Sequence, residues 1–312
     1  MRNHLNKLVI FTLLAFLVGA SGQALADNSH AFPVFRTGVG ARALGMGGAY
    51  VAVADDATAG YWNPAGLTGI EKTGNAQHKL GLSLSSMIAA DMAYDRQYNY
   101  IAAGLNAGKA GWFGFSWVDM GINDVMQYDA SDNQLGTFNA DDHGFILSYA
   151  NMANALSVGV SVKIAYQKIG SWNSQSGVGL DAGLKYAVND YLTLGAAAYD
   201  MGTKVGDYNI PLTFRLGMAA YALDGFTFAG DVVKVQDESN VKIHLGTEYD
   251  YCFKQTKNGD YFGAVRAGVS DGDFTVGAGL TVLSRFSIDY SYITESQDFL
   301  EHNHRVSLTV SF

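Results

Sequence analysis

The chain has 312 residues, of which 48% are hydrophobic, and its formal net charge is −9 at pH 7. This acidic balance disfavours nucleic acid as a partner, because binding to a phosphate backbone needs basic patches. The single cysteine, Cys252, excludes an internal disulfide framework and a cysteine-based zinc site, and we interpret it as a free thiol.

Residues 1–26 have the pattern of a secretory signal peptide. Arg2 and Lys7 precede an apolar run at 8–17, and Ala24-Leu25-Ala26 supplies an A-x-A cleavage pattern. The run is shorter than the roughly 20 residues that a membrane helix needs, so a cleaved signal is favoured over an anchor. Loss of the two basic residues with the signal would leave a mature chain of net charge −11.

Residues 27–76 lack regular alternation and are rich in small side chains. Between Phe35 and Leu67 glycine and alanine dominate, and residues 42–55 are predicted to form a compact helix or coil. A fourteen-stranded barrel is wider than one whose side chains fill the interior, so its bore has space for such a segment. We therefore predict that residues 27–76 form a plug, or hatch, inside a barrel.

From residue 77 to residue 312, polar and apolar residues alternate in segments close to the length of a tilted membrane strand, about 9–11 residues. This period-2 pattern predicts an all-β fold, a transmembrane antiparallel β-barrel of about fourteen strands. The alternation also explains why a chain of such hydrophobic composition has no second long apolar run. The predicted strands are 77–86, 97–107, 110–119, 143–150, 156–167, 177–188, 192–200, 211–222, 226–235, 241–251, 261–270, 274–283, 286–294 and 305–312.

The connections between these strands alternate between short and long, as in bacterial outer-membrane barrels with short periplasmic turns and long external loops. Two connections depart from the rule, since 254–260 is long for a periplasmic turn and 270–273 is short for an external loop. The short turns are 106–109, 189–190, 223–225 and 284–285. The long loops are 120–142, 169–176, 201–210 and 295–304.

The charged residues of the predicted strands fall on the polar face. A charge that faces lipid at the midplane costs about 2–4 kcal/mol, so these side chains are expected to point into the lumen and to pair there. The alternative to a ligand site is a purely structural ion-pair network. The residues are Lys163, Asp181, Lys185, Arg215, Asp231, Lys242, Glu248, Arg266, Asp289 and Arg305.

The last residues, RVSLTVSF, alternate and end on an aromatic side chain. Val306, Leu308, Val310 and Phe312 share one face of the predicted strand. This pattern resembles the closing strand of outer-membrane barrels, whose terminal phenylalanine is recognised by the insertion machinery. The resemblance implies two partners, the insertion machinery through Phe312 and outer-membrane lipid around the barrel.

The segment GARALGMGGAYVAVADDATAGYWNPAGL, residues 40–67, resembles the N-terminal signature of PorV/PorQ-family outer-membrane proteins, within the superfamily of FadL-type long-chain fatty-acid transporters. Asn63-Pro64-Ala65 is shared across that superfamily. Further matches near the C-terminus are Glu248-Tyr249, Arg266-Ala267-Gly268, Asp289-Tyr290 and His304-Arg305-Val306-Ser307. The resemblance implies a fourteen-stranded barrel with an N-terminal hatch, and we expect Arg42, Asp55, Asp56, Asn63 and Pro64 to take part in plugging or gating.

Two functions remain open for such a barrel in the cell outer membrane. FadL-like members admit hydrophobic small molecules through the hatch and a lateral gap in the wall, whereas PorV-like members receive exported cargo proteins in type IX secretion. The external loops are short for a cargo-binding platform, which favours transport. An outer-membrane hydrolase would need a Ser–His pair at one rim, and the sequence offers none with supporting context. We therefore expect no enzyme activity.

Three motifs suggest other chemistry but lack the context for it. Gly38 to Ala43 matches G-x-G-x-x-A without the βαβ unit that a dinucleotide site needs. His302-Asn303-His304 lacks the surroundings of a metal site, and a solvated loop is the preferred interpretation. Asp55-Asp56 is one acidic pair without further oxygen ligands, so capping a helix or pairing with Arg42 is preferred to Ca²⁺ binding. We expect neither a metal nor a cofactor.

Overall fold

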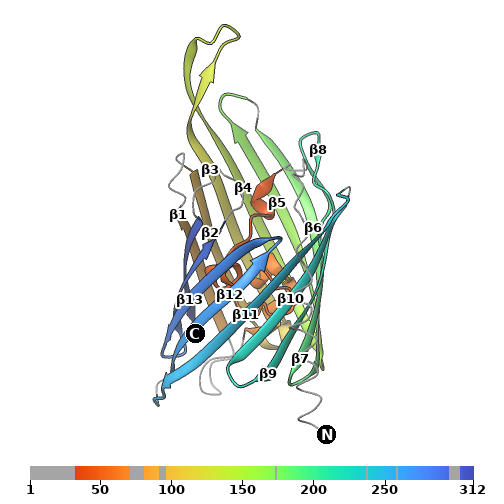
Figure 1. Cartoon of the computed structure of the whole chain (residues 1–312). Coiled ribbons are helices and arrows are strands. Elements are labelled where there is room, and N and C mark those ends of the chain that lie inside the picture. Colours follow the sequence, from red (N-terminus) through yellow and green to blue (C-terminus); the bar gives the residue numbers. More distant parts are fainter. Residues whose placement is uncertain are drawn as a thin grey trace.

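A computed structural model of the chain describes residues 32–70, 81–90, 96–172, 174–236, 238–257, 259–294 and 303–312. Within them, fourteen strands form a closed antiparallel barrel (Figure 1). The first and last strands, β1 and β15, pair with each other and β6 pairs with β7, so the ring is continuous. The predicted signal peptide and both predicted boundaries of the plug, at 26/27 and 76/77, lie outside the described residues.

The strands follow one another around the ring in chain order. Strand β8, Tyr208–Asn209, is a two-residue addition that pairs only with β7. The fourteen strands of the ring are β1 Gly81–Ala90, β2 Arg96–Asn106, β3 Trp112–Tyr128, β4 Gln134–Ala153, β5 Leu156–Ile169, β6 Gln175–Asn189, β7 Leu192–Val205, β9 Thr213–Leu223, β10 Phe226–Val235, β11 Val241–Lys254, β12 Tyr261–Ser270, β13 Asp273–Val282, β14 Phe286–Ile293 and β15 Asn303–Ser311.

The predicted alternation is confirmed in the wall of the barrel. Along β5 the side chains are alternately exposed and buried, with Val158, Val160 and Val162 on the outer face and Ser161 and Lys163 on the inner face. Successive side chains of a strand point to opposite faces of the sheet, so a single register separates apolar from polar residues. The outer face is therefore an apolar belt, as a membrane-spanning barrel requires.

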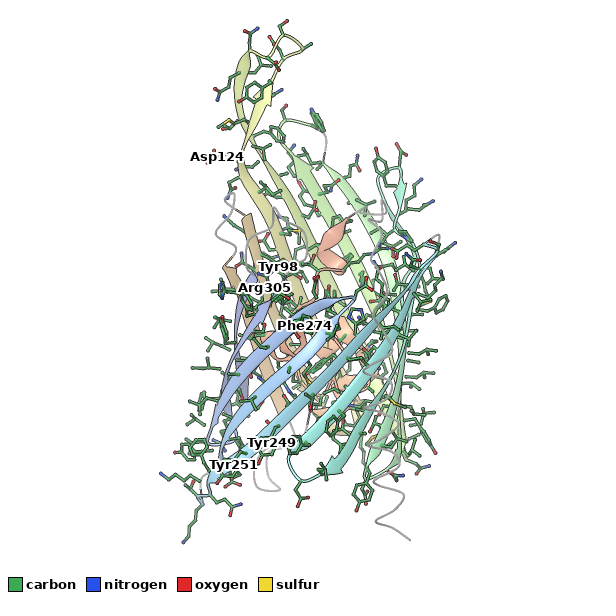
Figure 2. The ribbon with its side chains drawn as sticks, viewed as in Figure 1. Tyr98, Asp124, Tyr249, Tyr251, Phe274 and Arg305 are labelled. Atoms are coloured by element: carbon green, nitrogen blue, oxygen red, sulfur yellow. The ribbon has the colours of Figure 1, made fainter. Side chains whose placement is uncertain are left out.

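The predicted long loop at 120–142 is wrong. Strands β3 and β4 continue as a hairpin that projects beyond the rest of the barrel, and the turn between them spans only residues 129–133 (Figure 1). Asp124, labelled in Figure 2, lies in this hairpin with a φ of 53°, next to an irregularity in the register. The Asn-, Asp- and Gly-rich sequence suggests a loop, but cross-strand pairs such as Val125 with Phe138 extend the ladder.

The two ends of the barrel have different connections. One end, here called the turn end, carries the residues 107–111, 154–155, 190–191, 224–225, 255–260 and 283–285. The opposite end, here called the hairpin end, carries the β3–β4 hairpin. The predicted short turns all lie at the turn end, and 255–260 is a long connection there, as the sequence indicates.

Residues 32–70, here called the N-terminal segment, lie within the ring of strands (Figure 1). The segment contains four short helices, η1 Pro33–Phe35, α2 Ala41–Gly45, α3 Ala59–Trp62 and η2 Pro64–Gly69. Helix α2 packs against β12 to β15, whereas η2 packs against β2 to β6. The segment therefore touches separate arcs of the wall, and its alanines and glycines keep it compact enough to fit between them.

No helix in the described residues is long and apolar enough to cross a membrane.

Candidate functional site

Asn63 is a fully buried polar residue of the N-terminal segment and forms three hydrogen bonds. Its Nδ2 donates to the carbonyl oxygens of Val51, at 2.7 Å, and Leu184, at 3.0 Å, while its Oδ1 accepts from the backbone N–H of Ala65 at 3.1 Å. Asn63 precedes Pro64 at the start of η2, where an asparagine side chain caps the first turn and proline needs no N–H partner. One buried amide thus joins two parts of the segment to strand β6.

The wall positions opposite Asn63 and Pro64 are glycines, which have no side chain. A Cβ on Gly159 would collide with Pro64 and with the N–H of Ala65, and a Cβ on Gly183 would collide with Asn63 Oδ1. Glycine allows the closest approach of two backbones, which explains its presence on these two inner-face positions. At this place the barrel wall is one backbone thick between the segment and the exterior.

Two further wall residues hold the backbone of the N-terminal segment. Lys185 donates to the carbonyl oxygens of Val53 and Ala54, at 3.3 and 2.8 Å. Asp231 Oδ2 accepts from the N–H groups of Tyr50 and Val51, at 2.9 and 3.0 Å.

Arg215 reaches Asp231 Oδ2 at 3.7 Å, and its guanidinium lies 5.1 Å from the centre of the Trp62 ring. The pairing expected of Lys185 with a carboxylate is wrong, since backbone carbonyls of the segment receive it instead. These charges therefore anchor the segment rather than only one another.

A first ion cluster joins α2 to strands β11, β12 and β14. Glu248, fully buried, accepts from Arg42 Nη2 at 2.8 Å and from Arg266 Nε at 2.5 Å. Arg266 Nη1 donates to Asp289 at 2.7 Å, and Arg42 Nη1 donates to Asp55 at 2.8 Å. Burial lowers the pKa of Arg42, but the carboxylates of Asp55 and Glu248 outweigh this and raise it well above its usual value.

A second ion cluster lies on strands β5, β6 and β7. Lys163 Nζ is 3.0 Å from Asp181 Oδ2 and 2.9 Å from Asp200 Oδ1, and all three residues are buried. The N–H of Asp200 donates to Asp181 Oδ1 at 2.8 Å. Lys163 also lies 4.6 Å from the centre of the Phe35 ring, so the second cluster too touches the N-terminal segment.

The second cluster coincides with an irregular seam between β6 and β7. The register shifts between Val178 and Leu180 and again between Leu180 and Ala182. On β7, Asp200 and Gly202 have φ values of 62° and 66°, in the left-handed region. At this seam the N–H of Asp200 donates to the Asp181 carboxylate, so a side chain replaces part of the regular ladder.

The structure places every predicted site residue against the bore or the N-terminal segment. Asp56 caps the turn before α3, accepting from the N–H and the hydroxyl of Thr58. Burial, followed by repulsion from Asp55, raises the pKa of Asp56. Whether these residues gate a pathway stays a prediction.

Sequence reasoning missed Asp200 because strict alternation puts it on the outer face beside Ala198. The bulged backbone of β7 turns its side chain inward, and only the isolated acidic residue near a predicted strand end signalled an exception. Gly159 and Gly183 were missed as well. Nothing in the sequence showed that they oppose Asn63 and Pro64.

The motifs set aside in the sequence have ordinary surroundings. Gly38 to Ala43 forms a turn into the five-residue helix α2, where the N–H of Ala41 donates to Ser307. His304 bonds to the hydroxyl of Tyr290 at 2.7 Å, whereas His302 and Glu301 lie outside the described residues. In the described part of the chain no three metal-ligating side chains gather, and Cys252 is a free thiol.

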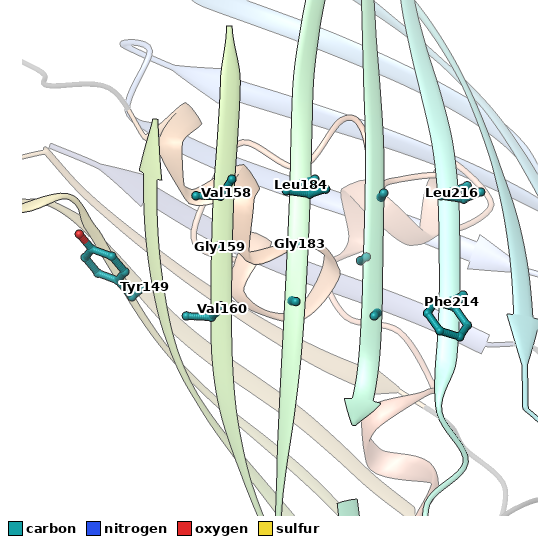
Figure 3. Close-up of a pocket in the computed structure, with 12 residues that line it drawn as sticks. Tyr149, Val158, Gly159, Val160, Gly183, Leu184, Phe214 and Leu216 are labelled. Carbon is teal, nitrogen blue, oxygen red and sulfur yellow. The ribbon is translucent and has the colours of Figure 1, made fainter. Parts of the chain in front are cut away.

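A depression lies in the outer face of the wall, directly outside Gly159 and Gly183 (Figure 3). Its volume is about 590 Å³ and its lining is almost wholly apolar. Small outer-face residues on adjacent strands, Ala182, Ala196 and Ala198, form its floor, while Val158, Val160, Leu184, Phe214, Leu216 and Tyr149 surround it. Figure 3 shows Val158 on β5, Leu184 on β6 and Leu216 on β9, with the N-terminal segment behind these strands.

We expect Asn63→Ala to lower the free energy of unfolding by about 1–3 kcal/mol, because the carbonyl groups of Val51 and Leu184 lose a buried donor. Urea unfolding in phospholipid vesicles, followed by tryptophan fluorescence, measures the change. Thr68→Ala is the control, since the Thr68 hydroxyl also joins the segment to the wall, through Ser157, but is only partly buried. An N63A variant no less stable than T68A would contradict the structural role of Asn63.

Solved structures share this barrel fold, and three of them are compared with the chain below. The Ralstonia pickettii toluene transporter TbuX has a TM-score of 0.58 at 13% identity, covering 90% of this chain and 98% of its own. The Pseudomonas putida toluene transporter TodX has 0.57 at 12% identity, with 88% and 97% covered. A Pseudomonas aeruginosa FadL homologue has 0.55 at 13% identity, with 87% and 97% covered.

At these identities the similarity establishes a FadL-like barrel fold and nothing finer. No protein-family model matches the chain, and no curated protein matches it.

Proposed function

We propose that this protein transports hydrophobic small molecules across the outer membrane, with the N-terminal segment as the plug of the barrel. The observation that carries the proposal is the apolar depression on the outer wall, which only the backbone at Gly159 and Gly183 separates from Asn63 and Pro64. The shared fold of two toluene transporters and a FadL homologue supports it. A molecule of this class partitions into lipid, so a docking place on the lipid-facing wall suits it.

The pathway we propose runs from the hairpin end, past the N-terminal segment, to the depression. The movable part is the turn at Asn63 to Ala65, because its contacts with the wall are one hydrogen bond, from Asn63 to the carbonyl oxygen of Leu184, and close packing against Gly159 and Gly183. The irregular seam between β6 and β7 adjoins the depression, and the backbone ladder there is interrupted by shifts in register. The two ion clusters hold the flanking parts of the segment in place.

The proposal also states what surrounds the barrel. Outer-membrane lipid contacts the apolar belt, the turn end faces the periplasm, and Phe312 is the residue that the insertion machinery recognises. The PorV/PorQ resemblance rests on the N-terminal motif and the C-terminal matches, and we keep that membership as a proposal. No contact among the described residues favours a secretion role, and the arrangement supports transport rather than catalysis.

We expect Ala198→Phe to reduce uptake of toluene severalfold, because a phenyl ring on the floor of the depression occupies the docking place. The substituted side chain faces lipid, so the stability of the barrel is expected to stay close to that of the wild type. Uptake of radiolabelled toluene by vesicles containing the purified protein measures the effect.

Ala278→Phe is the matched control, because Ala278 also lies on the outer face but on β13, away from the depression. The lateral pathway fails if both variants transport at the same rate as the wild type. Transport itself fails if wild-type vesicles take up toluene no faster than empty ones.

A further inference from the structure

The turn end of the barrel carries a group of three exposed cations, Lys254, Lys257 and Arg285, here called the basic rim. Lys254 ends β11, Lys257 lies in the connection to β12, and Arg285 lies in the β13–β14 turn. Within the described residues none of the three forms an ion pair, whereas the buried cations Lys163, Arg215 and Arg266 all do. The basic rim therefore holds positive charge that the protein itself leaves unneutralised.

The two turns that carry the basic rim brace each other. The N–H of Ser284 donates to the carbonyl of Asp260 at 2.8 Å, and the N–H of Asp260 donates to Ser284 Oγ at 2.9 Å. The Asp260 carboxylate accepts from the N–H of Thr256 at 3.3 Å. Because both turns are bonded in this way, Lys254, Lys257 and Arg285 are held on one side of the turn end.

Aromatic side chains of the outer wall lie immediately beside the basic rim. Tyr251 and Phe253 of β11 are 58% and 50% exposed, and Phe286 of β14 is 46% exposed. Lys254 Nζ lies 5.1 Å from the centre of the Tyr261 ring. Figure 2 shows Tyr249 and Tyr251 near this end of the barrel. Exposed aromatic rings next to lysines mark the depth at which lipid headgroups begin.

Charge at the hairpin end has the opposite sign. From residue 110 to residue 162 the chain has no lysine or arginine, yet it has six aspartates, at 119, 124, 129, 132, 141 and 142. At the turn end Asp190 and Asp224 lie on other turns, and Lys109 adds a further cation. Asp260 shares the connection with Lys257, and its carboxylate accepts from the N–H of Thr256. The basic rim is thus a local feature of an acidic protein and faces one membrane surface only.

We propose that the basic rim binds the phosphate headgroups of anionic phospholipids, with Lys254, Lys257 and Arg285 as the phosphate ligands and Tyr251 and Phe253 against the adjoining acyl chains. Unneutralised cations supply the attraction, and the exposed rings set their height in the bilayer. This binding goes beyond transport. It rests on the proposed orientation of the barrel for one point only, the identity of the leaflet that supplies the lipid. It would fix the depth and tilt of the barrel on the β11–β14 side.

The test is native mass spectrometry of the detergent-purified protein after mixing with phosphatidylglycerol or phosphatidylcholine. The wild type is expected to retain phosphatidylglycerol in preference to phosphatidylcholine, and K254Q/K257Q is expected to reduce that preference by about fivefold for each cation removed. R285Q reduces it further. Added salt is expected to weaken the preference, because exposed charges are screened.

K168Q/K204Q is the matched control, because it removes the same charge from two lysines at the hairpin end, of which Lys204 is exposed and Lys168 is partly exposed. The proposal is overturned if the wild type retains both lipids equally, or if the control loses as much preference as K254Q/K257Q. Toluene uptake is measured separately, so failure of transport and failure of lipid binding are distinguishable. Urea unfolding of each variant confirms that the barrel is intact, since exposed charges contribute little to stability.

Discussion

Replacing Lys163 with methionine is expected to lower the free energy of unfolding by about 3–5 kcal/mol, the usual cost of breaking a buried ion pair from one side. Asp181 and Asp200 are both buried, and Lys163 is the cation within 4.0 Å of either. Without it, two carboxylates face each other at the β6–β7 seam, and either a proton or water must enter. Urea unfolding in phospholipid vesicles measures the loss.

Lys168→Met is the control for this variant. Lys168 lies on the same strand, five residues further along, and its Nζ donates to the carbonyl oxygen of Trp172 at the surface. We expect K168M to stay within about 0.5 kcal/mol of the wild type, as surface substitutions usually do. Equal stability of the two variants would show that the second ion cluster does not hold the seam together.

Glu248→Ala is expected to cost about 3 kcal/mol, at the low end of the range for a buried pair broken from one side. Its carboxylate accepts hydrogen bonds from Arg42 and from Arg266, and both are lost. The cost is at the low end because each arginine retains an ion pair with a second carboxylate, Arg42 with Asp55 and Arg266 with Asp289. Since Arg42 belongs to the N-terminal segment, the variant is also expected to make this segment more susceptible to protease in detergent.

Asp55→Ala provides the comparison, because Asp55 contacts the same arginine but its side chain is 43% exposed. A surface ion pair contributes about 0–1 kcal/mol, so D55A is expected to lose far less than E248A. Limited proteolysis and urea unfolding of both variants separate loosening of the segment from unfolding of the barrel. If D55A and E248A lose the same stability, the buried carboxylate is not the anchor of α2.

The barrel wall could be predicted from the sequence because strand geometry leaves little choice. A strand with Val158, Val160 and Val162 on one face and Ser161 and Lys163 on the other has one register that keeps charge away from lipid. The same argument placed the cations and carboxylates of the ten predicted lumen residues on the inner face. It could not pair them, because partners such as Arg42 and Glu248 are 206 residues apart.

The features that the sequence did not reveal all break the period-2 rule. Asp200 faces inward because the backbone of β7 is bulged, and the hairpin at 120–142 continues as strands through residues that favour turns. The N-terminal segment has no period at all, so its contacts depend on shape. The glycines on β5 and β6 leave room for Asn63 and Pro64. They can be recognised as part of a site only when the position of the N-terminal segment against the wall is known.

The position of the N-terminal segment constrains how the molecule is built. Its helix α2 touches β12 to β15, and its helix η2 touches β2 to β6. The N-terminal segment, which is synthesised before these strands, therefore contacts both the earliest and the latest strands of the wall. Closure of the cylinder depends on pairing between β1 and β15, the two extremes of the wall. An already sealed cylinder would have to admit the 39 residues of this segment end-on, so the wall must wrap around the N-terminal segment.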